Sequence, residues 1–255
     1  MTVDQTSPAA RAARLNAWDA AKRPFVTPSL LNCDFAHVAD ELDALKKAGV
    51  VGVHLDVMDG HFVPNLSYGA PVIADWRKVT DFPFDAHLMM SDPGRYLDDF
   101  VRAGCDVIIV HIEVLPDPVP VLRRIRAAGC RASLSLNPPT PLSAILPHID
   151  EVDDVLVMSV MPGFGRQKFD ASVLDKVRAL RAGHPRLSIS IDGGINPTTV
   201  ADAVAAGANQ LVAGSAVFRK DKNYAAALAE LAEGARRGTE RGRGSAPPAP
   251  PPHPE

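Results

Sequence analysis

Residues 50–65 read VVGVHLDVMDGHFVPN, an apolar run that ends in a cluster of imidazole and carboxylate side chains. In a β-strand alternate residues share a face, so His54, Asp56 and Met58 are expected to point the same way. An imidazole and a carboxylate that face together at a strand end are what a metal site or a proton-transfer site requires. The stretch therefore predicts a buried strand with functional groups at its end.

Similar short apolar runs recur along the chain and alternate with amphipathic stretches. The predicted strands are Val26–Leu31, Val51–Asp56, Phe84–Leu88, Val107–His111, Ala132–Leu136, Val155–Val160, Leu187–Ile191 and Gln210–Val212. The predicted helices are Ala36–Ala48, Ala70–Lys78, Pro93–Ala103, Pro118–Ala128, Pro141–Leu146, Ser172–Ala182, Pro197–Ala206 and Tyr224–Glu233. Strand–helix alternation predicts parallel pairing and right-handed crossovers.

Eight such units are the number that closes an α/β fold into a (β/α)8 TIM barrel with a parallel eight-stranded core. An open doubly wound sheet is the alternative. That fold would normally have a Gly-rich turn after its first strand, where this chain has Leu31-Asn32-Cys33-Asp34.

Composition bounds the domain organisation. Residues 24–233 are predicted to form the barrel, and residues 1–23 an N-terminal extension with room for a short helix around Arg11–Lys22. Residues 234–255 are rich in Arg, Gly, Ala and Pro, a composition that predicts a disordered tail.

Charge and composition also exclude several classes of protein. A net charge of −3 argues against a nucleic-acid-binding surface, and no apolar run reaches the length of a membrane helix. The N-terminal residues lack a signal-peptide core, and three scattered cysteines do not make a disulfide framework. We expect a cytoplasmic protein that binds neither nucleic acid nor membrane.

Polar residues gather where the predicted strands end, which is where barrel enzymes place their active sites. In strand order they are Ser29; His54 and Asp56 with Met58; His87 with Met89; His111 and Glu113; Asn137; Ser159 with Met161; Asp192, Gly193 and Gly194; and Gly214 and Ser215. Four of them, His54, Asp56, His87 and Asp192, make a mixed nitrogen and oxygen ligand set for a divalent ion. Each alone could equally be a hydrogen-bonded structural residue or a turn cap.

Glycines follow the last three predicted strands, at Gly163 and Gly165, at Gly193 and Gly194, and at Gly214. Barrels often bind phosphate with such loops, because bare backbone N–H groups can approach an oxyanion there. One such loop could be only a tight turn, but three on adjacent strands favour a phosphate-bearing ligand.

With these residues together, the chain resembles the ribulose-phosphate 3-epimerase family from about Pro28 to Phe218. The resemblance depends on Pro28-Ser29-Leu30-Leu31, the stretch 54–65, Asp85-Ala86-His87-Leu88-Met89, the stretch 136–141 (LNPPTP), the stretch 157–165 (VMSVMPGFG) and Asp192-Gly193-Gly194-Ile195. It implies a metal-dependent isomerase of carbohydrate metabolism that inverts carbon 3 of a ketose phosphate. The implied reaction interconverts D-ribulose 5-phosphate and D-xylulose 5-phosphate through an enediolate.

The resemblance also implies roles for individual residues. His54, Asp56, His87 and Asp192 look like the metal ligands, with Asp56 and Asp192 as the acid–base pair on opposite faces of the substrate. The implied substrate contacts are Ser29, Met58, His87, Gly163, Phe164, Gly165, Arg166, Asp192, Gly193, Gly194, Gly214 and Ser215. Zn²⁺ is the first expectation for the metal, with Fe²⁺, Mn²⁺ or Co²⁺ as alternatives, and a homo-oligomer, dimer or hexamer, is expected.

Three departures from the family pattern surround the substrate and leave the metal set whole. Asn32-Cys33 stands where Ser-Ala is usual, Met161 replaces a polar residue, and Arg166 replaces a glycine. Met58, Met89 and Met161 could cover the intermediate with apolar groups, or could be plain core packing.

These departures leave other functions open. One is 3-epimerisation of another ketose phosphate, such as D-allulose 6-phosphate, and another is a non-catalytic sugar-phosphate-binding barrel. A lyase of the orotidine-decarboxylase type would need a lysine at the position of Met58.

Overall fold

Eight parallel strands form the centre of the molecule in the computed structural model, which describes residues 4–165 and 167–244. The strands are β1 (Phe25–Pro28), β2 (Val53–Met58), β3 (Phe84–Met89), β4 (Val107–His111), β5 (Arg131–Leu136), β6 (Asp154–Met158), β7 (Ser188–Asp192) and β8 (Gln210–Ala213). They pair in the order β1-β8-β7-β6-β5-β4-β3-β2, and a parallel bridge between Ser29 and His54 joins the two ends of this order. The predicted (β/α)8 TIM barrel is confirmed.

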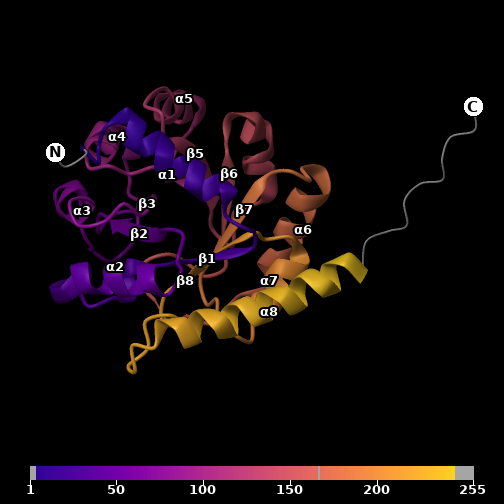
Figure 1. Cartoon of the computed structure of the whole chain (residues 1–255). Coiled ribbons are helices and arrows are strands. Elements are labelled where there is room, and N and C mark those ends of the chain that lie inside the picture. The colour runs from indigo at the N-terminus through magenta and orange to yellow at the C-terminus, as the bar shows by residue number, and fades with distance from the viewer. Residues whose placement is uncertain (1–3, 166, 245–255) are drawn as a thin grey trace, which may run out of the picture.

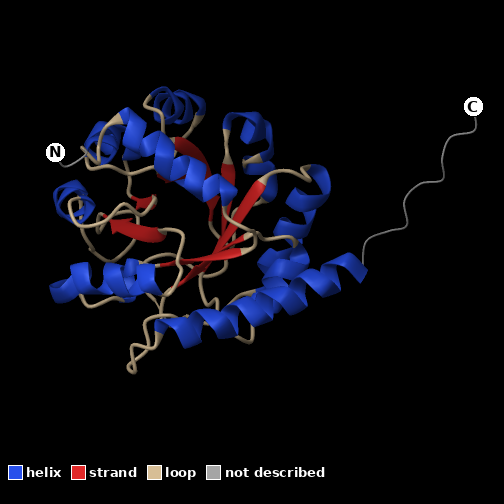
Figure 2. Cartoon of the chain, in the orientation of Figure 1, coloured by secondary structure: helices blue, strands red, loops and turns tan. Residues whose placement is uncertain are grey.

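Helices surround the strands, as Figure 2 shows. They are α1 (Pro8–Ala20), α2 (Val38–Lys47), α3 (Ala70–Arg77), α4 (Pro93–Arg102), α5 (Val119–Ala127), α6 (Leu174–Gly183), α7 (Val200–Ala206) and α8 (Tyr224–Gly244). After β5 the predicted helix 141–146 is wrong in type, since two 3₁₀ segments, η4 (Leu142–Ala144) and η5 (Leu146–Glu151), occupy this connection. Pro141 and Pro147 lack the N–H groups that a continuous α-helix would use.

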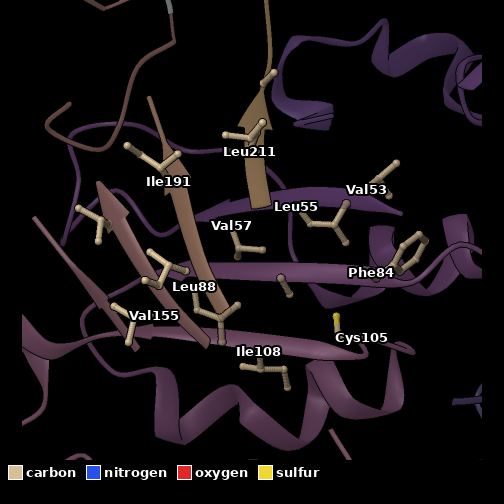
Figure 3. Close-up of a cluster of buried hydrophobic side chains, with 14 of the residues drawn as sticks. Val53, Leu55, Val57, Phe84, Leu88, Cys105, Ile108, Val155, Ile191 and Leu211 are labelled. Atoms are coloured by element: carbon tan, nitrogen blue, oxygen red, sulfur yellow. The ribbon is translucent and has the colours of Figure 1, made fainter. Parts of the chain in front are cut away.

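Each strand divides its side chains between two cores. Val53, Leu55 and Val57 of β2 belong to the outer core beneath the helices, as do the other side chains labelled in Figure 3. The intervening residues face the barrel interior, where Val107, Ile109, Leu156, Met158 and Val212 form a second apolar cluster with Trp18 and Phe25. The period of two in each strand therefore sends both His54 and Asp56 into the barrel, and the sequence predicts that they share a face.

The N-terminal extension contributes to this interior, which the sequence pattern does not predict. Trp18 of α1 is 2% exposed and packs edge-on against Phe25. A Cβ at Gly52, just before β2, would lie 2.5 Å from the Trp18 ring, so this glycine makes room for the indole. Helix α1 thus covers the amino end of the barrel, where it crosses in front of the strands in Figure 1.

The composition from residue 234 predicts a disordered tail, but this is wrong for residues 234–244, which continue α8 to Gly244. Helix α8 runs beside α7 (Figure 1). A Cβ at Gly234 would lie 2.4 Å from Val200, and one at Gly238 2.4 Å from the Ala201 carbonyl oxygen. These glycines serve close helix packing, which offsets their low helix propensity. Residues 245–255 of the predicted tail lie outside the described residues.

None of the helices in the described ranges combines the length and the apolar character of a membrane span.

Candidate active site

Four side chains converge at the carboxyl end of the barrel. His54 and Asp56 come from β2, His87 from β3 and Asp192 from β7, and one ligand atom of each lies within 4.8 Å of all the others. Both imidazoles are fully buried, and the Asp56 side chain is nearly so. The structure thus brings together the four residues that the sequence predicts as a ligand set.

The four side chains point at one another, but the distances between their nitrogen and oxygen atoms are long for hydrogen bonds. His54 Nε2 lies 3.5 Å from Asp56 Oδ1 and 4.0 Å from Asp192 Oδ2. His87 Nδ1 lies 3.4 Å from Asp56 Oδ1 and 3.8 Å from Asp192 Oδ2. Most of these separations are longer than a good hydrogen bond, so the lone pairs converge on a common point. Two carboxylates and two imidazoles arranged in this way fit a divalent cation, which would also offset the negative charge.

Burial and charge drive the pKa values of the two acids apart. Burial and the nearby Asp56 carboxylate raise the pKa of Asp192 to about 7. Burial would also raise the pKa of Asp56, but the imidazoles of His54 and His87 outweigh it and hold that pKa well below its usual range. In the metal-free protein at neutral pH, Asp56 is therefore ionised, while Asp192 can carry a proton.

The pKa values of the two imidazoles, His54 and His87, are also shifted in opposite directions. Burial opposes charge on His54, but Asp56 and Asp85 raise its pKa well above the ordinary value. For His87, burial and the neighbouring imidazoles of His111 and His54 lower the pKa to about 3. His87 is thus a neutral imidazole, the form that binds metals.

Neighbouring polar groups hold two of the ligands in place. His54 Nδ1 lies 3.0 Å from Asp85 Oδ2, which also accepts a 2.7 Å hydrogen bond from the Gln210 side-chain amide. The Ser29 hydroxyl donates to Asp56 Oδ2. These contacts fix the ring of His54 and the carboxylate of Asp56 before any ligand binds.

A cavity of about 290 Å³ opens above the four groups. Its walls include most of the predicted substrate contacts: Ser29, Met58, Gly163, Phe164, Gly165, Asp192, Gly193, Gly194, Gly214 and Ser215. His87 is not among these lining residues and lies buried behind them, so its predicted direct substrate contact is not supported by this geometry. Arg166 lies outside the described residues.

Glycines bring the backbone close to this cavity. Gly193 has φ 110°, and a Cβ there would lie 2.6 Å from Val160. A Cβ at Gly214 would lie 2.3 Å from the Asn32 side chain, which also lines the cavity. The loops after β7 and β8 therefore accept no larger residue at these positions and present main chain to the ligand.

The methionines that line the cavity differ from the expected set of Met58, Met89 and Met161. Met58 and Met89 are buried at the cavity wall, but Met161 is 51% exposed and does not belong to the lining. Met158 lines the cavity instead, because it follows the inward-facing Leu156 by two residues along β6. The alternation of β6 could have identified Met158 from the sequence.

Gln167 lines the cavity, although the sequence pattern places it only in the loop after the sixth strand and not among the substrate contacts. Its amide donates to the carbonyl oxygens of Met161 at 2.6 Å and Phe164 at 2.8 Å, so it closes the loop after β6 upon itself. Only the path of the loop reveals this contact, since nothing in the local pattern marks the residue.

Known proteins resemble this chain over most of its length. The model of the ribulose-phosphate 3 epimerase family matches residues 25–218. The ribulose-phosphate 3-epimerase of Mycobacterium tuberculosis is 47% identical over 212 residues, which cover 82% of this chain and 91% of the relative. That of Bacillus subtilis is 44% identical over 198 residues, covering 76% and 91%. The cytoplasmic isoform from Oryza sativa subsp. japonica is 45% identical over 197 residues, covering 76% and 86%.

Solved structures at low identity share the fold. The 3-keto-L-gulonate-6-phosphate decarboxylase of Vibrio cholerae superposes with a TM-score of 0.65 at 15% identity, covering 85% of this chain and 99% of that chain. The 3-hexulose-6-phosphate synthase of Salmonella typhimurium gives 0.62 at 16% identity, covering 84% and 99%. Likeness at such low identity shows only that the fold is a barrel. The family match and the relatives above 40% identity show the family as well. The chain belongs to the ribulose-phosphate 3-epimerase family.

Proposed function

We propose that this protein is a metal-dependent 3-epimerase that interconverts D-ribulose 5-phosphate and D-xylulose 5-phosphate. The observation that carries the proposal is the pair of carboxyl groups, Asp56 from β2 and Asp192 from β7, that meet within one ligand cluster at the cavity. In the metal-free protein their pKa values are also shifted in opposite directions. Two acids whose environments separate their pKa values are suited to act as base and acid in the same reaction. Membership of the epimerase family supports the same reaction.

His54, Asp56, His87 and Asp192 would hold the metal ion. When bound, a divalent ion supplies a Lewis acid that polarises a carbonyl oxygen and stabilises negative charge on it. Zn²⁺ is the first choice for this nitrogen and oxygen set, although Fe²⁺, Mn²⁺ and Co²⁺ suit it as well.

The two carboxyl groups would exchange the proton at carbon 3. The ionised Asp56 removes the proton from one face of the sugar, and the electron pair of the carbon–hydrogen bond moves toward the neighbouring carbonyl. Asp192, in its protonated form, then delivers a proton to the opposite face, so the centre is inverted. Across the bridge that closes the barrel, β1 and β8 lie between β2 and β7, which supports an approach of the two acids from different sides. The reverse reaction exchanges their roles.

The remaining cavity residues would hold the sugar phosphate away from water. Main chain at Gly193, Gly194 and Gly214 suits a phosphate, because unobstructed N–H groups can approach its oxygens. Met58, Met89 and Met158 would cover the carbon chain. A phosphate contact from Arg166 stays a prediction.

Proton exchange at carbon 3 tests the proposal. In deuterium oxide the protein should incorporate deuterium at carbon 3 of D-ribulose 5-phosphate and form D-xylulose 5-phosphate. Treatment with a chelator should stop both processes, and a divalent ion should restore them. A protein that catalyses neither process with any divalent ion would be a non-catalytic barrel, and faster turnover of D-allulose 6-phosphate would assign it to that substrate.

The variant Asp192→Asn tests the mechanism. It should lose epimerisation by about 10³-fold or more, because one face of the substrate no longer has a proton donor. Its circular dichroism should match that of the wild type. Near-normal turnover in this variant would rule out the two-acid mechanism.

Two expectations from the sequence belong with this proposal. A cytoplasmic location stays a prediction, and a homo-oligomer, dimer or hexamer, can be checked by light scattering coupled to size-exclusion chromatography.

A further inference from the structure

The two nitrogens of the His87 ring face different surroundings. Nδ1 faces the ligand cluster, 3.4 Å from Asp56 Oδ1 and 3.4 Å from His54 Nε2. Nε2 lies 2.7 Å from Nε2 of His111, the last residue of β4. His111 in turn places its Nδ1 2.9 Å from Glu113 Oε2. His111 and Glu113 lie at a predicted strand end, but they are neither ligands of the cluster nor lining residues of the cavity described above.

These contacts permit only one arrangement of protons around a bound metal. A ring nitrogen that binds a cation must offer its lone pair, so His87 would carry its proton on Nε2 and donate it to His111. Nε2 of His111 then accepts, which leaves the His111 proton on Nδ1, facing the Glu113 carboxylate. Glu113 thus determines which nitrogen of His111 carries the proton, and His111 in turn determines which nitrogen of His87 carries the proton.

Glu113 is a well-anchored end to this chain. Its Oε1 accepts a 2.7 Å hydrogen bond from the backbone N–H of Asn137 and another from the Thr140 hydroxyl. Lys176 Nζ donates to the carbonyl oxygens of Asn137, at 3.1 Å, and Thr140, at 2.6 Å, and so holds the same loop. Partial burial acts to raise the pKa of Glu113, but the hydrogen bonds from His111, Asn137 and Thr140 lower it to about 2. The carboxylate is therefore a permanent acceptor for His111.

A purely structural role would not need this chemistry. The two preceding inward-facing positions of β4 are occupied by Val107 and Ile109, so an apolar residue would fill the barrel equally well at position 111. His111 is instead fully buried, and both of its ring nitrogens have partners. His54 has a shorter tether of the same kind, directly to Asp85.

We propose that His111 and Glu113 are positioning residues that fix the tautomer and ring orientation of His87 and thereby strengthen binding of the divalent ion. This inference rests on the metal site of the proposed function. Neither residue touches the substrate cavity in the described structure, so they act through His87 alone.

Metal affinity tests the inference without relying on turnover. Co²⁺ binding to the metal-free protein is measured by competition with a chromophoric chelator, together with the visible absorption of the Co²⁺ complex. His111→Leu and Glu113→Gln should weaken Co²⁺ binding by about 10- to 100-fold, with the larger loss for His111→Leu. The absorption bands of bound Co²⁺ should shift, because the His87 ring is no longer held in one orientation.

Ser135→Ala is the matched control. Ser135 pairs with His111 across β4 and β5, is equally buried, and has no hydrogen-bond partner for its hydroxyl among the described residues. Its Co²⁺ affinity should equal that of the wild type. Glu113→Gln changes only one atom at a partly exposed side chain, so it keeps the test valid if His111→Leu fails to fold.

A second readout reports the tautomer directly. Ring nitrogen–hydrogen correlation spectra of the metal-free protein should show His87 protonated on Nε2, and this signal should broaden or move in Glu113→Gln. Wild-type Co²⁺ affinity in both variants, with an unchanged His87 tautomer, would overturn the inference while leaving the proposed function intact. A wild-type protein that binds no divalent ion would overturn the proposed function itself.

Discussion

The two ends of the barrel both bury charged side chains, but they balance the charge in different ways. At the amino end, Asp106 accepts hydrogen bonds from Arg14, at 2.8 Å, and from Arg77, at 3.2 Å, as well as from the backbone N–H of Phe84. At the carboxyl end, Asp56 and Asp192 face imidazoles at 3.4 Å to 4.0 Å and no guanidinium or ammonium group among the described residues.

This difference separates a structural site from a reactive one. The Asp106 carboxylate is paired with guanidinium groups within the chain, so it needs no added cation. In the Asp56 and Asp192 cluster the acids face only imidazoles, which can give up protons to a bound cation, and one of the acids has a pKa near neutrality. A barrel can thus use the same residue type for stability at one end and for chemistry at the other.

The largest expected effect comes from a pair of matched variants. Asp106→Asn leaves Arg14 and Arg77 buried without a counter-charge and should lower the free energy of unfolding by about 3–5 kcal/mol. Asp192→Asn should not lower it in the metal-free protein. The folded-state pKa of Asp192 is raised, so stability is lost as pH rises toward that pKa, and the uncharged amide avoids this loss. Urea unfolding at about pH 8 measures both variants. Equal losses would show that the two ends do not differ electrostatically.

The next largest expected effect is a loss of stability on removing the Trp18 indole at the amino end of the barrel. Trp18→Ala removes a side chain that is 2% exposed and should destabilise the protein by about 3 kcal/mol. The metal affinity of the folded protein should not change, because Trp18 lies at the opposite end of the barrel from the ligands. A substantial loss of Co²⁺ affinity in folded Trp18→Ala would mean that the two ends are coupled.

A smaller effect is expected at Asp154, a buried acid at the start of β6 that forms no ion pair with the described residues. Its carboxylate accepts hydrogen bonds from Ser133 and Ser190, but burial and the charge of Asp85 raise its pKa to about 6. Because the folded-state pKa is raised, stability is lost as pH rises from about 4 to 6 and stays low above that range. Asp154→Asn should recover up to about 3 kcal/mol at about pH 8 and nothing at about pH 4. A variant that is no more stable at the higher pH would show that Asp154 is adequately neutralised.

The sequence by itself determined the barrel and the four residues of the ligand set. Alternation along a strand fixes which side chains share a face, so His54 and Asp56 could be placed on one face, at a strand end, from spacing alone. Eight strand–helix units and glycines after the last strands predicted where a phosphate-bearing ligand would bind. Those features depend on local periodicity, which a single strand or turn already contains.

Only the tertiary structure decided which groups meet across the barrel. The opposite pKa shifts of Asp56 and Asp192 depend on β2 and β7 bringing them together, and the chain from Glu113 to His87 crosses two strands. The same is true of Trp18, whose burial needs the space at Gly52, and of α8, whose glycines pack against α7. Such contacts join residues far apart in the chain, and their energies depend on distance and burial, which spacing along the sequence does not specify.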